Sequence, residues 1–178
     1  GLGFAAVRDV ASWIRYDEEA LFNNDYLLSF GLSQSGRFLR NYLYLGFNED
    51  EAGRQVFAGM MPHIAGASRI DLNRRGAEPV SQGQYTATAF PFTDAALPDP
   101  VSGATEGLLD NPRARASQPK IFYTDTGVEY WGGGRVAALT HSLPDGGADI
   151  NLQDNVRLYL FSSAQHTPGA FPPPEATN

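Results

Sequence analysis

The chain has 178 residues, a hydrophobic content of 42% and a formal net charge of -7, which suits one globular domain with its own core. It has no basic cluster, no cysteine and no apolar run of about 18 residues, the length that a membrane span needs. We therefore expect no nucleic-acid or membrane partner, no disulfide and no thiolate chemistry.

The first part of the sequence predicts helices that alternate with short buried strands. A helix is expected over 2–16, a strand over 26–31 and a second helix over 35–45. A polar loop over 46–51 precedes another apolar run, 56–64, in which we expect a strand. The apolar face of the first helix is predicted to consist of Leu2, Ala5, Ala6, Val10, Trp13 and Ile14.

The second part begins with a stretch of different composition. Residues 69–118 are rich in Pro, Gly, Asp and Ala, and we expect them to form a packed excursion or cap. Strands are predicted over 119–125 and 155–161, with a helix over 135–141 between them. The tail, 168–178, contains three consecutive prolines and is expected to be extended.

This order of elements predicts an α/β fold. Short buried strands that alternate with helices are typical of a mostly parallel sheet with flanking helices. We expect a single domain over residues 1–178, since the length suits one domain and no internal repeat divides the chain.

A glycine- and serine-rich stretch carries the clearest chemical signal. It runs from Gly31 to Gly36, reads Gly-Leu-Ser-Gln-Ser-Gly and lies between a predicted strand and a predicted helix. A serine at such a break is presented as a nucleophile, and the helix N-terminus stabilises an oxyanion beside it. We predict Ser33 as the nucleophile and the N–H of Gln34 as an oxyanion donor. Ser35 stands where the usual G-x-S-x-G pattern has its last glycine, which weakens the match without removing it.

A serine nucleophile needs a base, and the chain offers three histidines. His166 follows the last predicted strand. In α/β hydrolases, whose strand–serine–helix turn (the elbow) the segment 31–36 resembles, the histidine has this position. His63 lies beside Pro62 in an apolar run, which favours a packed histidine satisfied by the backbone. His141 ends a predicted helix, where a cation suits the helix dipole. His166 is the predicted base, and its alternative role is to anchor the tail.

The carboxylate that orients the base should follow the strand before the last one. The candidates are Asp125, Glu129, Asp145, Asp149 and Asp154. Asp125 is close to the end of its strand, which is early for leaving the sheet, whereas Glu129 comes two residues after Gly127. We favour Glu129 over Asp125 as the acid. The alternative for Glu129 is a loop carboxylate paired with Arg135.

The acidic segment 48–51 is a second candidate site, because acidic loops bind calcium in some proteins. It lacks the spacing and the final glutamate of an EF-hand loop. We expect a solvated loop with one carboxylate near Arg54, and no metal site.

With these residues in place, the chain resembles the α/β-hydrolase superfamily, and more narrowly the bacterial proteins described as alpha/beta hydrolase domain-containing. The segments that carry the likeness are 1–9, 31–40, 46–57, 129–131 and 165–166. The resemblance implies a serine hydrolase with Ser33 as nucleophile and His166 as base, and its match around residue 129 agrees with Glu129 as the acid. Carboxylic esters are the substrates that it suggests.

The sequence departs from that superfamily in one respect. Only one predicted helix precedes the strand with the elbow, so we expect the N-terminal strands to be lacking. The loop that donates a second oxyanion N–H is then lacking too. Either a longer natural protein or a second chain is expected to complete the sheet, and we expect catalysis only from the completed domain.

Substrate selectivity is expected to lie in the cap over 69–118. Its aromatic residues Tyr85, Phe90 and Phe92 are predicted to line an acyl or aryl pocket. The alternative is a surface loop that covers the sheet and contacts no substrate.

The predicted function is hydrolysis of a small carboxylic ester through an acyl-enzyme, which needs no cofactor and no metal. Two alternatives stay open. One is a non-catalytic α/β-hydrolase-like binding domain, and the other is an acyltransferase or amidase that uses the same three side chains.

Overall fold

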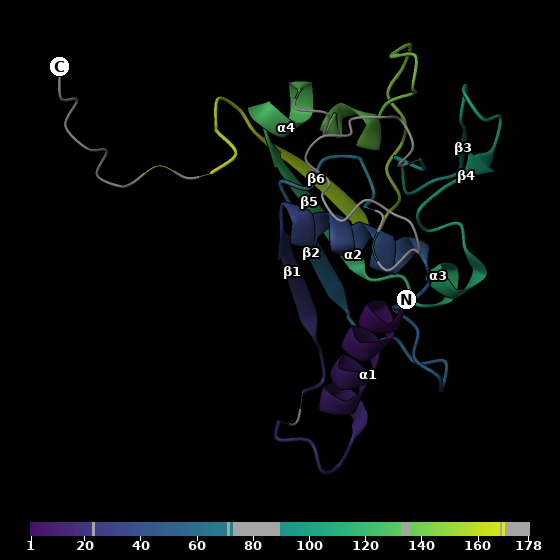
Figure 1. The fold of residues 1–178 in the computed structure, drawn as a ribbon, viewed down its shortest axis with the longest axis vertical. Helices are drawn as coiled ribbons and strands as arrows, with labels where there is room; N and C mark the ends of the chain where they lie inside the picture. The colour runs from purple at the N-terminus through teal and green to yellow at the C-terminus, as the bar shows by residue number, and fades with distance from the viewer. Residues whose placement is uncertain (23, 71, 73–89, 133–135, 168, 170–178) are drawn as a thin grey trace.

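The computed structural model describes residues 1–22, 24–70, 72, 90–132, 136–167 and 169. A parallel four-stranded sheet, of order β1-β2-β5-β6, organises them (Figure 1). Its strands are β1 (Leu28–Leu32), β2 (Gly59–His63), β5 (Lys120–Thr126) and β6 (Val156–Phe161). The predicted parallel sheet with flanking helices is thus confirmed, and each predicted strand lies within two or three residues of its expected place.

The helices and the shorter elements are only partly as expected. The two long helices are α1 (Leu2–Tyr16) and α2 (Gln34–Tyr44), which confirm the predictions over 2–16 and 35–45. The helix expected over 135–141 is, in its described part, a single 3-10 turn, η2 (Ala137–Thr140). The elements that the sequence did not indicate are α3 (Pro112–Ala116), α4 (Gly127–Trp131) and the small hairpin β3 (Leu97–Pro98) with β4 (Thr105–Glu106).

One face of the sheet forms the core with α1 and α2. Met60, Ile121 and Val156 lie side by side across three strands and are nearly fully buried. Phe4 of α1 is also buried and stacks on Phe38 of α2, with 4.6 Å between the ring centroids. Burial of apolar surface between the sheet and these helices is therefore the main stabilising contribution here.

The opposite face of the sheet is apolar and largely uncovered within the part of the chain that the structure describes. Its large side chains are Leu28, Phe30, Leu32, Met61, Phe122, Tyr159 and Phe161. Leu28 is 77% exposed and Phe30 is 62% exposed. Parallel sheets are normally covered on both faces, so an exposed apolar face of this size is unusual.

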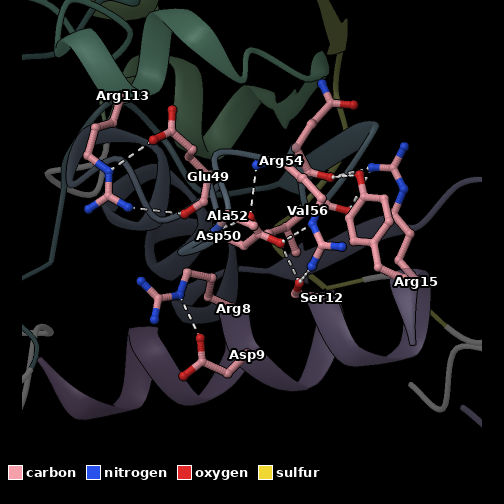
Figure 2. Close-up of polar contacts among 12 residues, drawn as sticks. Arg8, Asp9, Ser12, Arg15, Glu49, Asp50, Ala52, Arg54, Val56 and Arg113 are labelled. Atoms are coloured by element: carbon pink, nitrogen blue, oxygen red, sulfur yellow. Dashed lines mark hydrogen bonds and ion pairs between the residues drawn. The ribbon is translucent and has the colours of Figure 1, made fainter. Parts of the chain in front are cut away.

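The buried side of α1 differs from the sequence prediction. Its buried residues are Phe4, Arg8, Ala11 and Ser12, whereas the expected core residues Leu2, Val10 and Trp13 are exposed. The prediction of the buried face was wrong because α1 packs partly through polar contacts with the segment 49–56 (Figure 2).

Asp50 is the centre of these polar contacts. It is 4% exposed, and it accepts hydrogen bonds from the Ser12 hydroxyl at 2.6 Å and from Arg54 Nε at 2.8 Å (Figure 2). The expected pairing with Arg54 is confirmed, but the expectation of a solvated loop was wrong for Asp50. Burial by itself would raise the pKa of Asp50, but the bonds from Ser12 and Arg54 outweigh it and lower the pKa to about 2.

Replacement of Asp50 should change the pH dependence of stability. Because the folded-state pKa lies below the ordinary value of 3.8, the bonds of Asp50 stabilise the fold above about pH 4 and are lost as the pH falls toward 2. We expect Asp50→Asn to lower the free energy of unfolding at pH 7 by about 1–3 kcal/mol and to reduce its fall below pH 4. Urea unfolding across this range measures both. The exposed substitution Glu18→Gln serves as control, and an Asp50→Asn protein with the wild-type pH dependence would contradict the assignment.

Candidate active site

Ser33 lies at the junction of β1 and α2 in a strained conformation. Its φ of 56° and ψ of -111° are rare for any residue other than glycine and cost on the order of 1–3 kcal/mol. The Ser33 N–H donates to the carbonyl of His63 at the end of β2, at 2.8 Å. The N–H of Arg37 donates to the Ser33 carbonyl at 3.1 Å. The strand and the helix therefore fix this turn from both sides, at the C-terminal edge of the sheet.

Two glycines allow α2 to approach the sheet closely enough for this turn. A Cβ atom on Gly31 would lie 2.5 Å from the carbonyl oxygen of Ser35. A Cβ on Gly36 would lie 2.8 Å from the Cβ of Ala65 and 2.9 Å from the carbonyl oxygen of Gly31. Gly36 thus makes the close contact with the sheet, whereas Ser35, at the place of the usual last glycine, is exposed.

The structure brings three predicted side chains together at this edge. Ser33 Oγ lies 3.2 Å from Nε2 of His166, and Nδ1 of His166 lies 2.5 Å from Oε1 of Glu129. Ser33 follows β1, Glu129 belongs to α4 directly after β5, and His166 comes from the segment after β6. A histidine held between a hydroxyl and a carboxylate can take a proton from the hydroxyl.

Glu129 is fully buried, and Thr126 donates hydrogen bonds to its second carboxylate oxygen. The hydroxyl of Thr126 donates to Oε2, and the Thr126 N–H donates to the same oxygen at 3.3 Å. Burial raises the pKa of Glu129, but the bonds from Thr126 and His166 outweigh this effect, and the net pKa is lowered. Glu129 is therefore held as a carboxylate beside the imidazole.

Asp125, the other candidate acid, faces a different group. It accepts the N–H of Gly66 at 3.0 Å and is 2% exposed. Burial is the largest influence on this carboxyl and raises its pKa. Of the two carboxylates that the sequence left open, Glu129 is the one in contact with His166. Arg135, the alternative partner of Glu129, lies outside the described residues.

The other two histidines have packing roles. His63 stacks against Phe30 with 6.0 Å between the ring centroids, and its Nδ1 lies 2.8 Å from the Thr124 hydroxyl. It is packed as expected, but its partner is a side chain and not the backbone. His141 follows η2, and its Nε2 lies 2.9 Å from the hydroxyl of Tyr130.

Gln34 is the first residue of α2, so its N–H is among those that have no acceptor within the helix. This N–H belongs to the residue directly after Ser33. Its place at a helix N-terminus suits it to bind an anionic oxygen that forms at the serine.

Only part of the predicted cap can be described. Phe92 is 8% exposed and packs edge-on against Phe90, whereas Tyr85 lies outside the described residues. Arg40, which is fully buried, donates to the carbonyls of Ala67 at 2.8 Å and Phe92 at 2.6 Å. It thereby joins the segment that enters the excursion to Phe92 within it. A substrate-binding role for Tyr85, Phe90 and Phe92 stays a prediction.

The described ranges contain neither a metal-ligand cluster nor a membrane-spanning helix. No group of three or more potential metal ligands comes together there. None of the helices in that part of the chain is long and apolar enough to cross a membrane.

Comparison with known protein families decides the classification. A family model described as "Alpha/beta hydrolase domain" matches residues 1–177. The chain belongs to this alpha/beta hydrolase family. Neither a curated protein nor a solved structure matches it. The membership agrees with the parallel sheet and with the strand–serine–helix turn, and it supports a hydrolase as the general class.

The immediate support of Glu129 in this member of the alpha/beta hydrolase family was not expected from the sequence. Thr126 and Glu129 form a capping box at the start of α4, in which the Thr126 hydroxyl oxygen accepts the N–H of Glu129 and the Glu129 carboxylate accepts the N–H of Thr126. The pattern T-x-x-E, which is a helix-start signal, was visible in the sequence at these positions. Tyr130 belongs to the segment 129–131 that carries the family resemblance, but its contact with His141 was not expected.

Gly31 offers a direct test of the tight turn. We expect Gly31→Ala to lower the free energy of unfolding by about 1–3 kcal/mol, since its methyl group would overlap backbone atoms that cannot move aside cheaply. Gly127→Ala is the control, because a Cβ there would meet its nearest atoms at 3.8 Å, an ordinary contact. Urea unfolding measures both, and equal stability of the two variants would contradict this description of the elbow.

Proposed function

We propose that this alpha/beta hydrolase cleaves small carboxylic esters through a covalent acyl-enzyme. The observation that supports the proposal is the alignment of three groups, with Ser33 Oγ 3.2 Å from His166 Nε2 and His166 Nδ1 2.5 Å from Glu129 Oε1. Isolated pairs of this kind occur in many folds, but a strained serine at a helix N-terminus beside such a pair suits nucleophilic catalysis.

The proposed reaction begins with the tautomer of His166. If Nδ1–H donates to the carboxylate of Glu129, Nε2 is left as an acceptor for the proton of the Ser33 hydroxyl. Ser33 Oγ then attacks the ester carbonyl carbon, and Nε2 takes the proton. When the C–O bond of the ester breaks, His166 returns that proton to the leaving alcohol. Water then attacks the acyl-enzyme, again with His166 as base, and releases the acid and free Ser33.

Glu129 has two proposed roles in this sequence. Its carboxylate holds the imidazole in the required tautomer, and it stabilises the imidazolium that forms when Ser33 loses its proton. The lowered pKa of Glu129 suits both roles because the group stays charged at neutral pH.

The N–H of Gln34 is the proposed donor to the oxyanion, and a second donor is expected from outside the sheet described above. Among the residues that the structure describes, β1 is an edge strand, and Phe30 and its neighbours are exposed on one face of the sheet. Such an edge and such a face suit a further polypeptide that adds a strand beside β1 and a layer over the apolar face. We propose that this polypeptide, a second chain or a longer form of this one, also supplies the second oxyanion donor.

Labelling with a fluorophosphonate probe tests the nucleophile. We expect covalent labelling of Ser33 that Ser33→Ala abolishes, because the probe reacts only with an activated serine. Glu129→Gln should slow labelling by about 10²-fold or more, within the range of positioned proton transfer. Ser35→Ala, which removes the neighbouring exposed hydroxyl, is the control and should be labelled like the wild type. A folded protein without label would contradict the proposal and favour the binding domain.

Completion of the sheet has its own test. Loss of one oxyanion donor lowers kcat by about 10²–10³. We therefore expect the 178-residue chain alone to hydrolyse p-nitrophenyl acetate with a kcat about 10²–10³-fold lower than that of a preparation in which a further polypeptide pairs with β1. Hydrogen exchange of the β1 amides reports the pairing. Equal kcat values in the two preparations would show that no second donor is needed.

A further inference from the structure

Glu129, the acid of the proposed site, belongs to a helix that is stable only through contacts with the rest of the protein. Glu129 belongs to α4, which has five residues, and a helix this short is not stable by itself in water. The capping box at Thr126 fixes its start but involves the Glu129 side chain itself. Besides its bonds to Thr126 and His166, the direction of the Glu129 carboxylate therefore depends on what holds the rest of α4.

Tyr130, the next residue of α4, makes the contact that can do this. Its hydroxyl lies 2.9 Å from Nε2 of His141, and the two rings stack with 5.7 Å between centroids and 25° between planes. Both residues are half-buried. The pair thus joins α4 to the segment after η2 by a hydrogen bond and by ring packing.

His141 is itself held on two sides. Its backbone carbonyl accepts the N–H of Ile150 at 2.7 Å, and its Nδ1 lies 3.3 Å from Oδ1 of Asp149. If Nδ1–H donates to Asp149, Nε2 is the acceptor for the Tyr130 hydroxyl. Asp149 is 81% exposed on its side chain, so its contact adds little stability, and the backbone bond is the firmer of the two.

We propose that Tyr130 and His141 are positioning residues for Glu129, and through it for His166. This inference rests on the proposed function. Tyr130 is adjacent to Glu129 within a single helical turn, so a shift of Tyr130 displaces the Glu129 carboxylate. The contact of Glu129 with His166 Nδ1, at 2.5 Å, leaves little room for such a shift. Misplacement by about 1 Å can cost 10²-fold in rate.

Tyr130→Phe is the sharpest variant, because it removes the hydroxyl and keeps the ring. We expect the rate of fluorophosphonate labelling of Ser33 to fall by about tenfold, part of the contribution that positioned proton transfer makes. The far-downfield proton NMR signal of His166 Nδ1–H, which reports its bond to Glu129, should shift or broaden. The thermal midpoint should change by only a few degrees. Tyr16→Phe, which removes a hydroxyl that donates to the Gln55 carbonyl at 2.6 Å in the contact between α1 and the segment 49–56, is the matched control.

Two variants of His141 distinguish a loss of positioning from a general loss of stability. His141→Gln keeps a side-chain acceptor for the Tyr130 hydroxyl, whereas His141→Leu keeps only bulk. We expect the glutamine variant to retain more of the labelling rate and of the downfield signal than the leucine variant.

Equal labelling and an unchanged downfield signal in Tyr130→Phe would overturn the positioning role. A fall in the thermal midpoint without a change in the signal would also overturn it, because that result indicates a merely structural contact. If the wild type is not labelled at Ser33 at all, the proposed function fails, and the NMR signal still decides whether Tyr130 positions Glu129.

Discussion

The strained backbone of Ser33 is the constraint on which the rest of this structure depends. A non-glycine residue keeps a backbone φ of 56° and ψ of -111° only where the surrounding structure holds it there. Here the carbonyl of His63 binds the Ser33 N–H, and Gly31 and Gly36 let the first turn of α2 come close to β1. Packing of α2 against the core face offsets the cost of this turn. Packing in the core therefore stabilises the conformation of Ser33 at the site.

Parallel strand order explains how distant parts of the chain reach this serine. In a parallel sheet all C-terminal strand ends meet at one edge, where ligands commonly bind. Ser33 follows β1, Glu129 follows β5 and His166 follows β6. Their separation along the chain is thus irrelevant to their distance in space. What remains to be fixed is the direction of each side chain, and short local elements such as α4 do this.

One face of the sheet is apolar and is not covered by the residues that the structure describes. Phe30, Phe122 and Tyr159 face outward in a sheet type that is normally buried on both sides. The strands read as continuous apolar runs for this reason, although the described residues cover only one face. The polypeptide that we propose as the source of the second oxyanion donor would also cover this face.

Much of this arrangement could be predicted from the sequence, because the strands are apolar runs and the elbow has a compact signature. The order of serine, acid and histidine indicated which side chains meet. The buried face of α1 could not be predicted from periodicity, since Arg8 and Ser12 are buried by partners in a distant loop that includes Asp50. The helix α4 was missed because five residues carry too little periodic signal, although its capping pattern was present.

The most direct measurement is a crystal structure of the protein after reaction with a fluorophosphonate. We expect phosphorus bonded to Ser33 Oγ, one phosphoryl oxygen within hydrogen-bond distance of the Gln34 N–H, and the His166 imidazole still in contact with Glu129. An adduct on another residue, or one at Ser33 with its phosphoryl oxygen turned away from the N-terminus of α2, would contradict this expectation.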